Sequence, residues 1–162
     1  MSSGTHTPDT PRARTAGVIA PPPLIYGVPL LAGLLLDRWS PWPLVAGRAT
    51  MPGALVLVLL GFIALPAVLA FRKARTHPEP WKPTKALVTV GPYRFSRNPM
   101  YVGFTLCYLG IAGWRNSVWP LLALPVVLAV MQVGVVHREE RYLERLFGED
   151  YRAYRARVRR WF

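Results

Sequence analysis

Cysteine and acidic residues are both scarce in this sequence of 162 residues. The single cysteine, Cys107, excludes an internal disulfide and a multi-cysteine metal site, and no metal is expected. Only eight aspartate and glutamate residues accompany 20 lysine and arginine residues, which gives a formal net charge of +12 at pH 7. Such an excess of positive charge favours an anionic partner, either nucleic acid or a membrane surface.

Charge is absent altogether from three long stretches, residues 18–36, 49–71 and 117–136, and from a shorter one, 100–113. The long stretches are near the ~20 residues that a helix needs to cross the hydrocarbon core of a bilayer. Because the basic residues lie beside these stretches, membrane lipids rather than nucleic acid are the expected partners. The sequence predicts an all-α integral membrane protein with about four transmembrane helices, over 18–36, 49–71, 99–114 and 117–136.

The length of the chain fits one domain, over residues 18–162, which follows a Ser/Thr/Pro-rich N-terminal tail at 1–17. The first apolar stretch is longer than the ~7–15 residues of a signal-peptide core, and three prolines interrupt it early. This favours a retained first span over a cleaved signal. The oligomeric state stays open.

Lysine and arginine are distributed unevenly among the segments outside the predicted spans. The segment 72–99 holds seven and the segment 137–162 holds eight, whereas the tail, the first loop and the third loop hold two, two and one. The positive-inside rule therefore places 72–98, 137–162 and both termini in the cytoplasm. Because the third loop is very short, spans 3 and 4 are predicted to form a helical hairpin whose cytoplasmic ends bring 72–98 and 137–162 together.

Polar side chains crowd the start of the third span, with Tyr93, Arg94, Arg97 and Asn98 directly before Pro99. Proline suits the first turn of a helix, and the free N–H groups there can bind a carboxylate. Taken singly, the arginines are explained as topology determinants and the tyrosines as an interfacial aromatic belt.

Two carboxylates, Glu139 and Glu140, directly follow the fourth span, where a charge is costly unless it is solvated or paired. The simplest interpretation pairs them with neighbouring arginines, Arg138, Arg141 or Arg145. Further on, one face carries the aromatic and apolar residues Tyr151, Tyr154, Val158 and Trp161. This pattern is typical of a basic amphipathic helix that lies on the inner leaflet.

Two motifs resemble those of a known family. The run GPYRFSRNPMYVG at 91–103 matches the G-x-Y-x-x-x-R-[HN]-P-x-Y-x-G signature of isoprenylcysteine carboxyl methyltransferases, and phospholipid methyltransferases and their bacterial relatives are similar. The segment from Glu139 to Tyr154 matches the E-E-x-x-L-x-x-x-F-G-x-x-Y-x-x-Y pattern of the same family. Together the motifs cover the chain from about residue 87 to 158.

The resemblance implies S-adenosylmethionine as cofactor, with S-adenosylhomocysteine as product, held between the loop before the hairpin and the segment after it. The residues that it implies for cofactor binding are Lys85, Ala86, Leu87, Val88, Tyr93, Asn98, Pro99, Met100, Tyr101 and Glu139. Supporting roles fall to Arg97, Glu140, Tyr151 and Tyr154. No catalytic residue is assigned.

The resemblance further implies methyl transfer to a membrane-associated or lipophilic acceptor, such as an isoprenylcysteine-like carboxylate, a lipid amine or a small thiol. It places the protein in a bacterial inner membrane. Asn98 stands where many members have histidine, and Val135 stands where eukaryotic isoprenylcysteine enzymes have a substrate-binding arginine. Two alternatives stay open: a non-catalytic membrane scaffold or assembly protein, and an NADPH-dependent sterol-type reductase.

Overall fold

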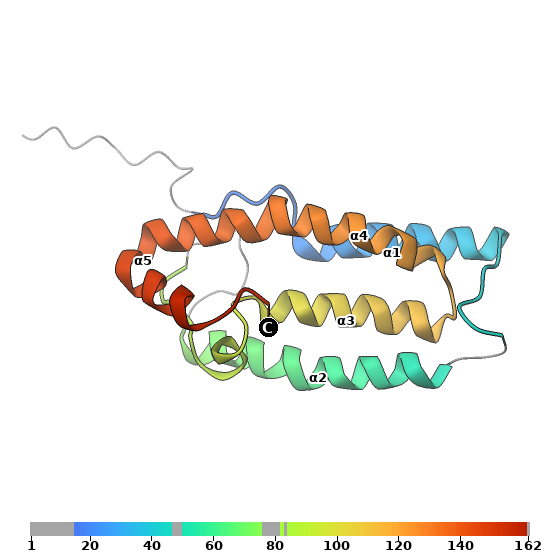
Figure 1. The fold of residues 1–162 in the computed structure, drawn as a ribbon, viewed down its shortest axis with the longest axis horizontal. Coiled ribbons are helices and arrows are strands. Elements are labelled where there is room, and N and C mark those ends of the chain that lie inside the picture. Colours follow the sequence, from blue (N-terminus) through green and yellow to red (C-terminus); the bar gives the residue numbers. More distant parts are fainter. Residues whose placement is uncertain (1–14, 47–49, 76–81, 83, 162) are drawn as a thin grey trace, which may run out of the picture.

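Long helices run alternately up and down the molecule and contain most of the residues that the structure describes (Figure 1). The structure is a computed structural model, and it describes residues 15–46, 50–75, 82 and 84–161. The helices are α1 (Pro22–Trp39), α2 (Thr50–Lys73), η2 (Gly91–Arg94), α3 (Pro99–Trp114), α4 (Trp119–Met131), η3 (Gln132–Val136) and α5 (His137–Arg157). Of these, η2 is a 3-10 helix and η3 a π-helix. The described residues form no strand beyond an isolated bridge, so the all-α prediction is confirmed for them.

The bounds of the helices follow the charge-free stretches, with one shift at the N-terminus. The helix α3 begins at Pro99 and ends at Trp114, as predicted. The helix α1 begins at Pro22 rather than at residue 18 and continues to Trp39. Because proline lacks an N–H group, the proline run at 21–23 suits the first turn of a helix but not its interior.

One helix among the described residues is long and apolar enough to cross a bilayer: it begins at Trp119 and runs through α4, η3 and the first part of α5. Up to the break at Gly148 it would rise by about 43 Å, more than the roughly 30 Å of a hydrocarbon core. Only the part at 119–136 is free of charge. The apolar part of the helix therefore ends near His137, where α5 begins.

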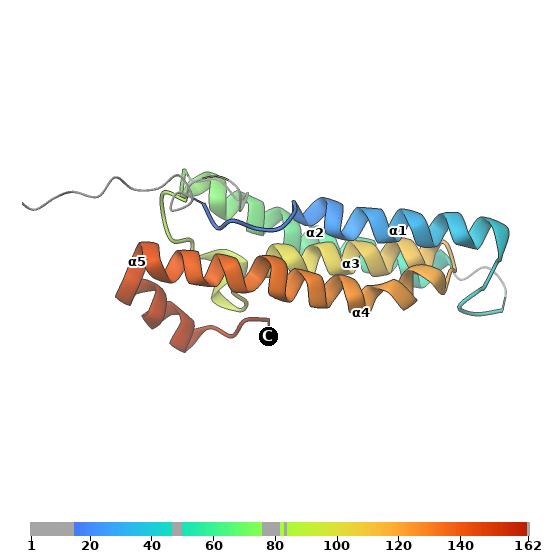
Figure 2. The ribbon, with the colours of Figure 1, turned by 90° about the horizontal axis from the view of Figure 1, so that it is seen from above.

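Each helix of the predicted hairpin also has a close neighbour outside it. A tight connection at 115–118 joins α3 to α4, as expected. However, the backbone of α3 lies closest to α2 and that of α4 closest to α1 (Figure 1, Figure 2). Side chains of α3 and α4 still pack in one buried cluster, and the Tyr108 hydroxyl donates to the Pro120 carbonyl at 2.7 Å. The α1–α4 contact is close, because a Cβ atom added at Gly33 would lie 2.7 Å from the backbone nitrogen of Pro120. The two helices of the predicted hairpin therefore share side-chain contacts, although each lies closer to a neighbour outside the hairpin.

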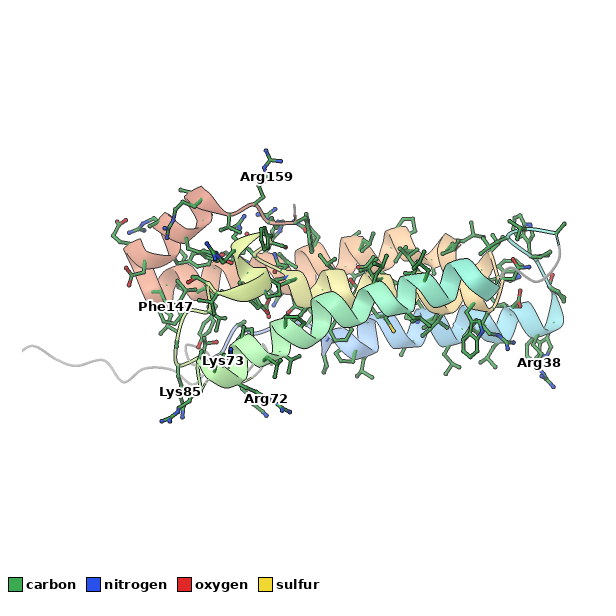
Figure 3. All side chains as sticks on the ribbon, turned by 90° about the horizontal axis from the view of Figure 1, so that it is seen from below. Arg38, Arg72, Lys73, Lys85, Phe147 and Arg159 are labelled. Atoms are coloured by element: carbon green, nitrogen blue, oxygen red, sulfur yellow. The ribbon has the colours of Figure 1, made fainter. Side chains whose placement is uncertain are left out.

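The segments rich in basic residues gather at one end of the molecule. Figure 3 shows Arg72, Lys73, Lys85, Phe147 and Arg159 toward this end, with Arg38 at the opposite end. This is the arrangement that an even number of alternating helices requires. It brings 84–98 and 137–161 together, as the sequence predicted.

The C-terminal part of α5 folds back on the molecule instead of continuing along its axis. The chain reverses at Gly148, whose φ of 50° and ψ of −117° are non-helical, and glycine adopts a positive φ without steric cost. After this reversal Tyr151 and Tyr154 are buried. The aromatic face that the sequence assigned to the inner leaflet therefore packs on the protein itself, and that prediction is wrong for these two residues.

Candidate functional site

The loop before α3 is held in place by the end of α2. It turns at Gly91, where φ is +62°, and enters η2. Tyr93 is buried there with Ala67 and Ala70 of α2, and its ring lies edge-on to Phe71 with centroids 5.4 Å apart. The first motif therefore has a fixed position at this end of the bundle.

The start of α3 meets the start of α5 through one short hydrogen bond. The Tyr101 hydroxyl, on the first turn of α3, donates to Oε1 of Glu139 at 2.6 Å. The backbone N–H groups of Tyr101 and Val102 donate to the carbonyl of Asn98 at 3.1 and 3.2 Å, which closes the first turn. These contacts join residues of the two motifs directly.

The second carboxylate, Glu140, has partners that are distant in the sequence. Its Oε1 lies 3.0 Å from Nη1 of Arg97, and Arg160 donates to both of its oxygens, at 3.0 and 2.7 Å. The side chains of Glu140 and Arg97 are each only 9% exposed. The expected pairing with Arg138, Arg141 or Arg145 is therefore wrong for Glu140, because the reversal at Gly148 brings Arg160 within reach.

The C-terminal segment binds the first motif through several backbone contacts. The Tyr154 hydroxyl donates to the Tyr93 carbonyl at 2.7 Å, and the Arg97 backbone N–H donates to the Arg159 carbonyl at 3.0 Å. The Asn98 amide donates through Nδ2 to the carbonyl of Arg160 at 3.1 Å. The side chain of Asn98 thus holds the C-terminal segment, in addition to being near the cavity.

Both motif segments and the end of α2 enclose a cavity. Its wall contains the predicted residues Ala86, Leu87, Val88, Tyr93, Asn98, Met100, Tyr101 and Glu139, together with Arg97, Glu140, Tyr151 and Tyr154. Two predicted residues do not line it: Pro99 is buried in the first turn of α3, and Lys85 is exposed. The structure therefore brings most of the predicted residues to one place.

Some wall residues were not predicted from the sequence, namely Ala16, Phe71, Thr84, Tyr142 and Leu143. Two of them could have been found, because Tyr142 and Leu143 follow Glu139 by three and four residues and so share its helix face. The other three carry no local signal. Ala16 comes from the segment before α1, and Phe71 from the end of a uniformly apolar helix.

Burial changes the acid–base properties of the cavity. Burial, the largest effect, and the nearby Glu140 charge raise the pKa of Glu139 to about 7, while the hydrogen bond from Tyr101 lowers it. Burial and then the Glu139 charge raise the pKa of Tyr93, which stays neutral at physiological pH. Within the described residues, the buried Nε of Arg97 has no hydrogen-bond partner. The site thus combines a carboxyl group that ionises near neutral pH, aromatic rings and a buried guanidinium donor.

The sequence model of the phospholipid methyltransferase family matches residues 42–150. An uncharacterized protein of Haemophilus influenzae is 36% identical over 62 residues, which is 38% of this chain and 98% of that protein. The cobalt-zinc-cadmium resistance protein CzcN of Cupriavidus metallidurans is 36% identical over 63 residues, 39% of this chain and 29% of that protein. The protein-S-isoprenylcysteine O-methyltransferase of Schizosaccharomyces pombe is 36% identical over 72 residues, 44% of this chain and 30% of that protein. The matches thus span less than a third of the last two relatives.

Proposed function

Since the chain belongs to the phospholipid methyltransferase family, we propose that it transfers a methyl group from S-adenosylmethionine to a membrane-associated or lipophilic acceptor. Membership of this family and similarity to an O-methyltransferase support methyl transfer as the class of activity. One observation carries the proposal further: Tyr101 and Glu139, 38 residues apart and from separate motifs, meet in one cavity. A merely structural pair of motifs would not need a cavity between them.

The polar groups of the cavity fit a ligand that has both a positive centre and a carboxylate. S-adenosylmethionine, when bound, supplies an activated methyl group on a sulfonium cation. The Glu139 carboxylate can accept hydrogen bonds from an ammonium group or from ribose hydroxyls. The faces of Tyr93 and Tyr101 can attract a cation. The Nε of Arg97, which has no hydrogen-bond partner among the described residues, suits a carboxylate.

The role of these residues in catalysis is positioning. Methyl transfer from a sulfonium is an in-line displacement, so holding donor and acceptor in line contributes most of the rate that a protein can supply. A carboxylate or thiolate acceptor is already nucleophilic, whereas an ammonium or alcohol must lose a proton. The chemistry of the acceptor therefore decides whether a base is required.

We place the cavity at the cytoplasmic face of a bacterial inner membrane. The four helical stretches α1, α2, α3 and α4–η3 are the proposed spans, with both termini inside. The concentration of lysine and arginine at 72–99 and 137–162 supports this orientation. The donor then enters from the cytoplasm, and the acceptor approaches from the bilayer, between helices.

The proposal is tested by titrating the purified protein with S-adenosylhomocysteine in a calorimeter. We expect binding in the micromolar range, weakened at least about tenfold by Glu139→Gln, because a charge-assisted hydrogen bond contributes about 1.5–3 kcal/mol. Tyr101→Ala should weaken binding as well. The matched control is Glu144→Gln, since Glu144 lies on the same helix and pairs with the exposed Arg155 outside the cavity. Normal binding by both cavity variants would overturn the site assignment.

The same titration separates the two alternative functions. A sterol-type reductase would bind NADPH, and a scaffold would bind neither ligand. For the acceptor, membranes are incubated with radiolabelled donor and the labelled product is identified. Label that appears in a lipid or lipidated fraction supports the proposed acceptor class, and label confined to water-soluble products contradicts it.

A further inference from the structure

Three arginines form an exposed basic cluster on α5, outside the donor cavity. Arg138, Arg141 and Arg145 follow each other at spacings of three and four residues, which puts them on one helix face. Together with Thr15, Ala16 and Gly17 of the segment before α1, they line a hollow on the surface. Ala16 also lines the donor cavity, so the two sites are neighbours.

These arginines differ from the other arginines of the C-terminal segment in what they contact. Arg152 and Arg155 pair with Glu144, and Arg160 pairs with Glu140. For Arg138, Arg141 and Arg145, no carboxylate in the part of the chain that the structure describes lies within ion-pair distance. The cluster therefore concentrates positive charge that no carboxylate of the described residues neutralises.

The hydrogen bonds that the cluster makes leave most of its donors available. Arg138 donates through Nη1 to the Gly17 carbonyl at 2.9 Å, and Arg141 donates through Nε to the His137 carbonyl at 3.3 Å. A guanidinium group has five N–H donors, and its planar fork matches the oxygens of a phosphate group. Like charges at these helical spacings repel each other, and a bound anion would remove that repulsion.

The position of the cluster along the helix indicates which kind of anion it binds. The charge-free stretch ends at Val136, and Arg138 follows within two residues. From Arg138 to Arg145 the helix rises by about 10 Å, comparable to the headgroup layer of roughly 5–8 Å on each side of the core. With the spans proposed above, the first arginine of the cluster lies at the depth of lipid phosphates.

We infer that Arg138, Arg141 and Arg145 form a binding site for the phosphate of an anionic membrane phospholipid. The lipid phosphate is held between this face of α5 and the segment 15–17. That segment is already fixed to the helix, since the backbone N–H of Ile19 donates to the Gly134 carbonyl at 3.2 Å. A lipid bound there fastens the segment 15–17 beside the donor cavity. This inference does not depend on methyl transfer.

The test uses the purified full-length chain in detergent with dioctanoyl phosphatidylglycerol as the probe. Retained lipid is measured by native mass spectrometry, and the gain in melting temperature by thermal unfolding. The variant Arg138→Gln/Arg141→Gln/Arg145→Gln should lose at least about 30-fold in lipid affinity, since each basic residue near an anionic surface contributes about fivefold. The matched control, Arg152→Gln/Arg155→Gln/Arg157→Gln, removes the same charge from the same helix and should lose less than about threefold.

Two further measurements identify the source of the phosphate and keep the test valid if the triple variant does not fold. Inorganic phosphate at equal concentration should neither stabilise the protein nor displace the lipid, and if it does both, the lipid assignment is overturned. If the triple variant does not fold, the single variant Arg141→Gln should still lose about fivefold, because Arg141 contacts only its own helix. Equal lipid binding by wild type and the Gln variants refutes the site.

S-adenosylhomocysteine binding is measured on the same samples. Lipid binding without S-adenosylhomocysteine binding keeps this inference and rejects the proposed function, and the reverse result rejects only this inference.

Discussion

The hydroxyl of Tyr101 lies 2.6 Å from Oε1 of Glu139 and donates a hydrogen bond to it. This bond links the first turn of α3 to the first turn of α5, at the wall of the cavity. The hydrogen bond favours the ionised form of Glu139, against burial and the neighbouring Glu140 charge, which raise its pKa. The hydrogen bond from Tyr101 therefore helps to decide how much of Glu139 is ionised, and so the charge in the cavity, near neutral pH.

Tyr101→Phe should weaken the binding of a cationic donor and raise the pKa of Glu139 further. The substitution keeps the ring and removes only the donated hydrogen bond, so a loss of about 3- to 30-fold in affinity is expected. Calorimetric titration with S-adenosylmethionine at several pH values measures both effects. The control is Tyr108→Phe, whose hydroxyl donates to the Pro120 carbonyl at 2.7 Å elsewhere on α3. Equal effects of the two substitutions would show that the Tyr101 hydroxyl has no special role.

Donor affinity should rise as the pH is increased through about 7. Glu139 has a pKa of about 7 in the folded protein, raised by burial from 4.5. A positively charged donor binds the ionised carboxylate, so binding near this pH releases a proton. Titrations in buffers of different ionisation enthalpy detect the released proton. In Glu139→Gln the affinity should be low and independent of pH over this range.

The stability of the unliganded protein should fall as the pH is raised toward about 7, whereas donor affinity should rise. Between pH 4.5 and about 7 the folded state keeps a proton on Glu139 that the unfolded chain releases. The stability from this proton is fully present below about pH 4.5 and is lost as the pH rises through about 7. The melting temperature of the wild type should therefore fall relative to that of Glu139→Gln over this window. Parallel curves for the two proteins would contradict the raised pKa.

The Arg97–Glu140–Arg160 contacts should be important for stability, in contrast to the exposed ion pairs of α5. Glu140→Ala leaves the buried guanidinium of Arg97 without its carboxylate partner, which costs about 3–5 kcal/mol when both groups are buried. Arg160→Gln should cost less, because the side chain of Arg160 is 33% exposed. Thermal unfolding of the two variants is compared with that of Arg155→Gln, an exposed pair expected to contribute less than about 1 kcal/mol. A Glu140→Ala variant as stable as Arg155→Gln would show that this network is not needed.

The meeting of the two motifs could be predicted from the sequence, whereas their fine contacts could not. Charge-free stretches give the lengths of the helices, and an even alternation of helices brings Tyr93 and Glu139 to the same end. The pairing of Glu140 with Arg160 requires the reversal at Gly148. A glycine permits such a turn, but nothing local specifies that the chain returns toward Arg97.

The packing partners of α3 also could not be predicted from the sequence. Its apolar residues surround the helix on all sides, so no stripe indicates which face meets a neighbour. Gly103 and Gly110 are both buried, and the backbone of α3 lies closest to α2. Helices that are apolar all round can exchange neighbours without changing their pattern, and only the three-dimensional arrangement decides between them.

The contact between α1 and α4 gives a final prediction, because it depends on one glycine. Gly33 is buried, and a Cβ atom there would lie 2.7 and 2.9 Å from the backbone nitrogen and Cα of Pro120. Backbone atoms cannot rotate away as a side chain can, so Gly33→Ala must push the helices apart. Overpacking of this kind costs about 1–3 kcal/mol, which should appear as a lower melting temperature in detergent.

Gly27 provides the control for Gly33→Ala, since it lies on the same helix with nothing within 4 Å of an added Cβ atom. Gly27→Ala should leave the melting temperature unchanged or raise it, because alanine favours the helix by about 1 kcal/mol over glycine. The donor cavity lies at the end of the molecule away from Gly33, so S-adenosylhomocysteine affinity should be preserved in both variants. If Gly33→Ala is as stable as Gly27→Ala, then α1 and α4 do not approach each other as closely as described.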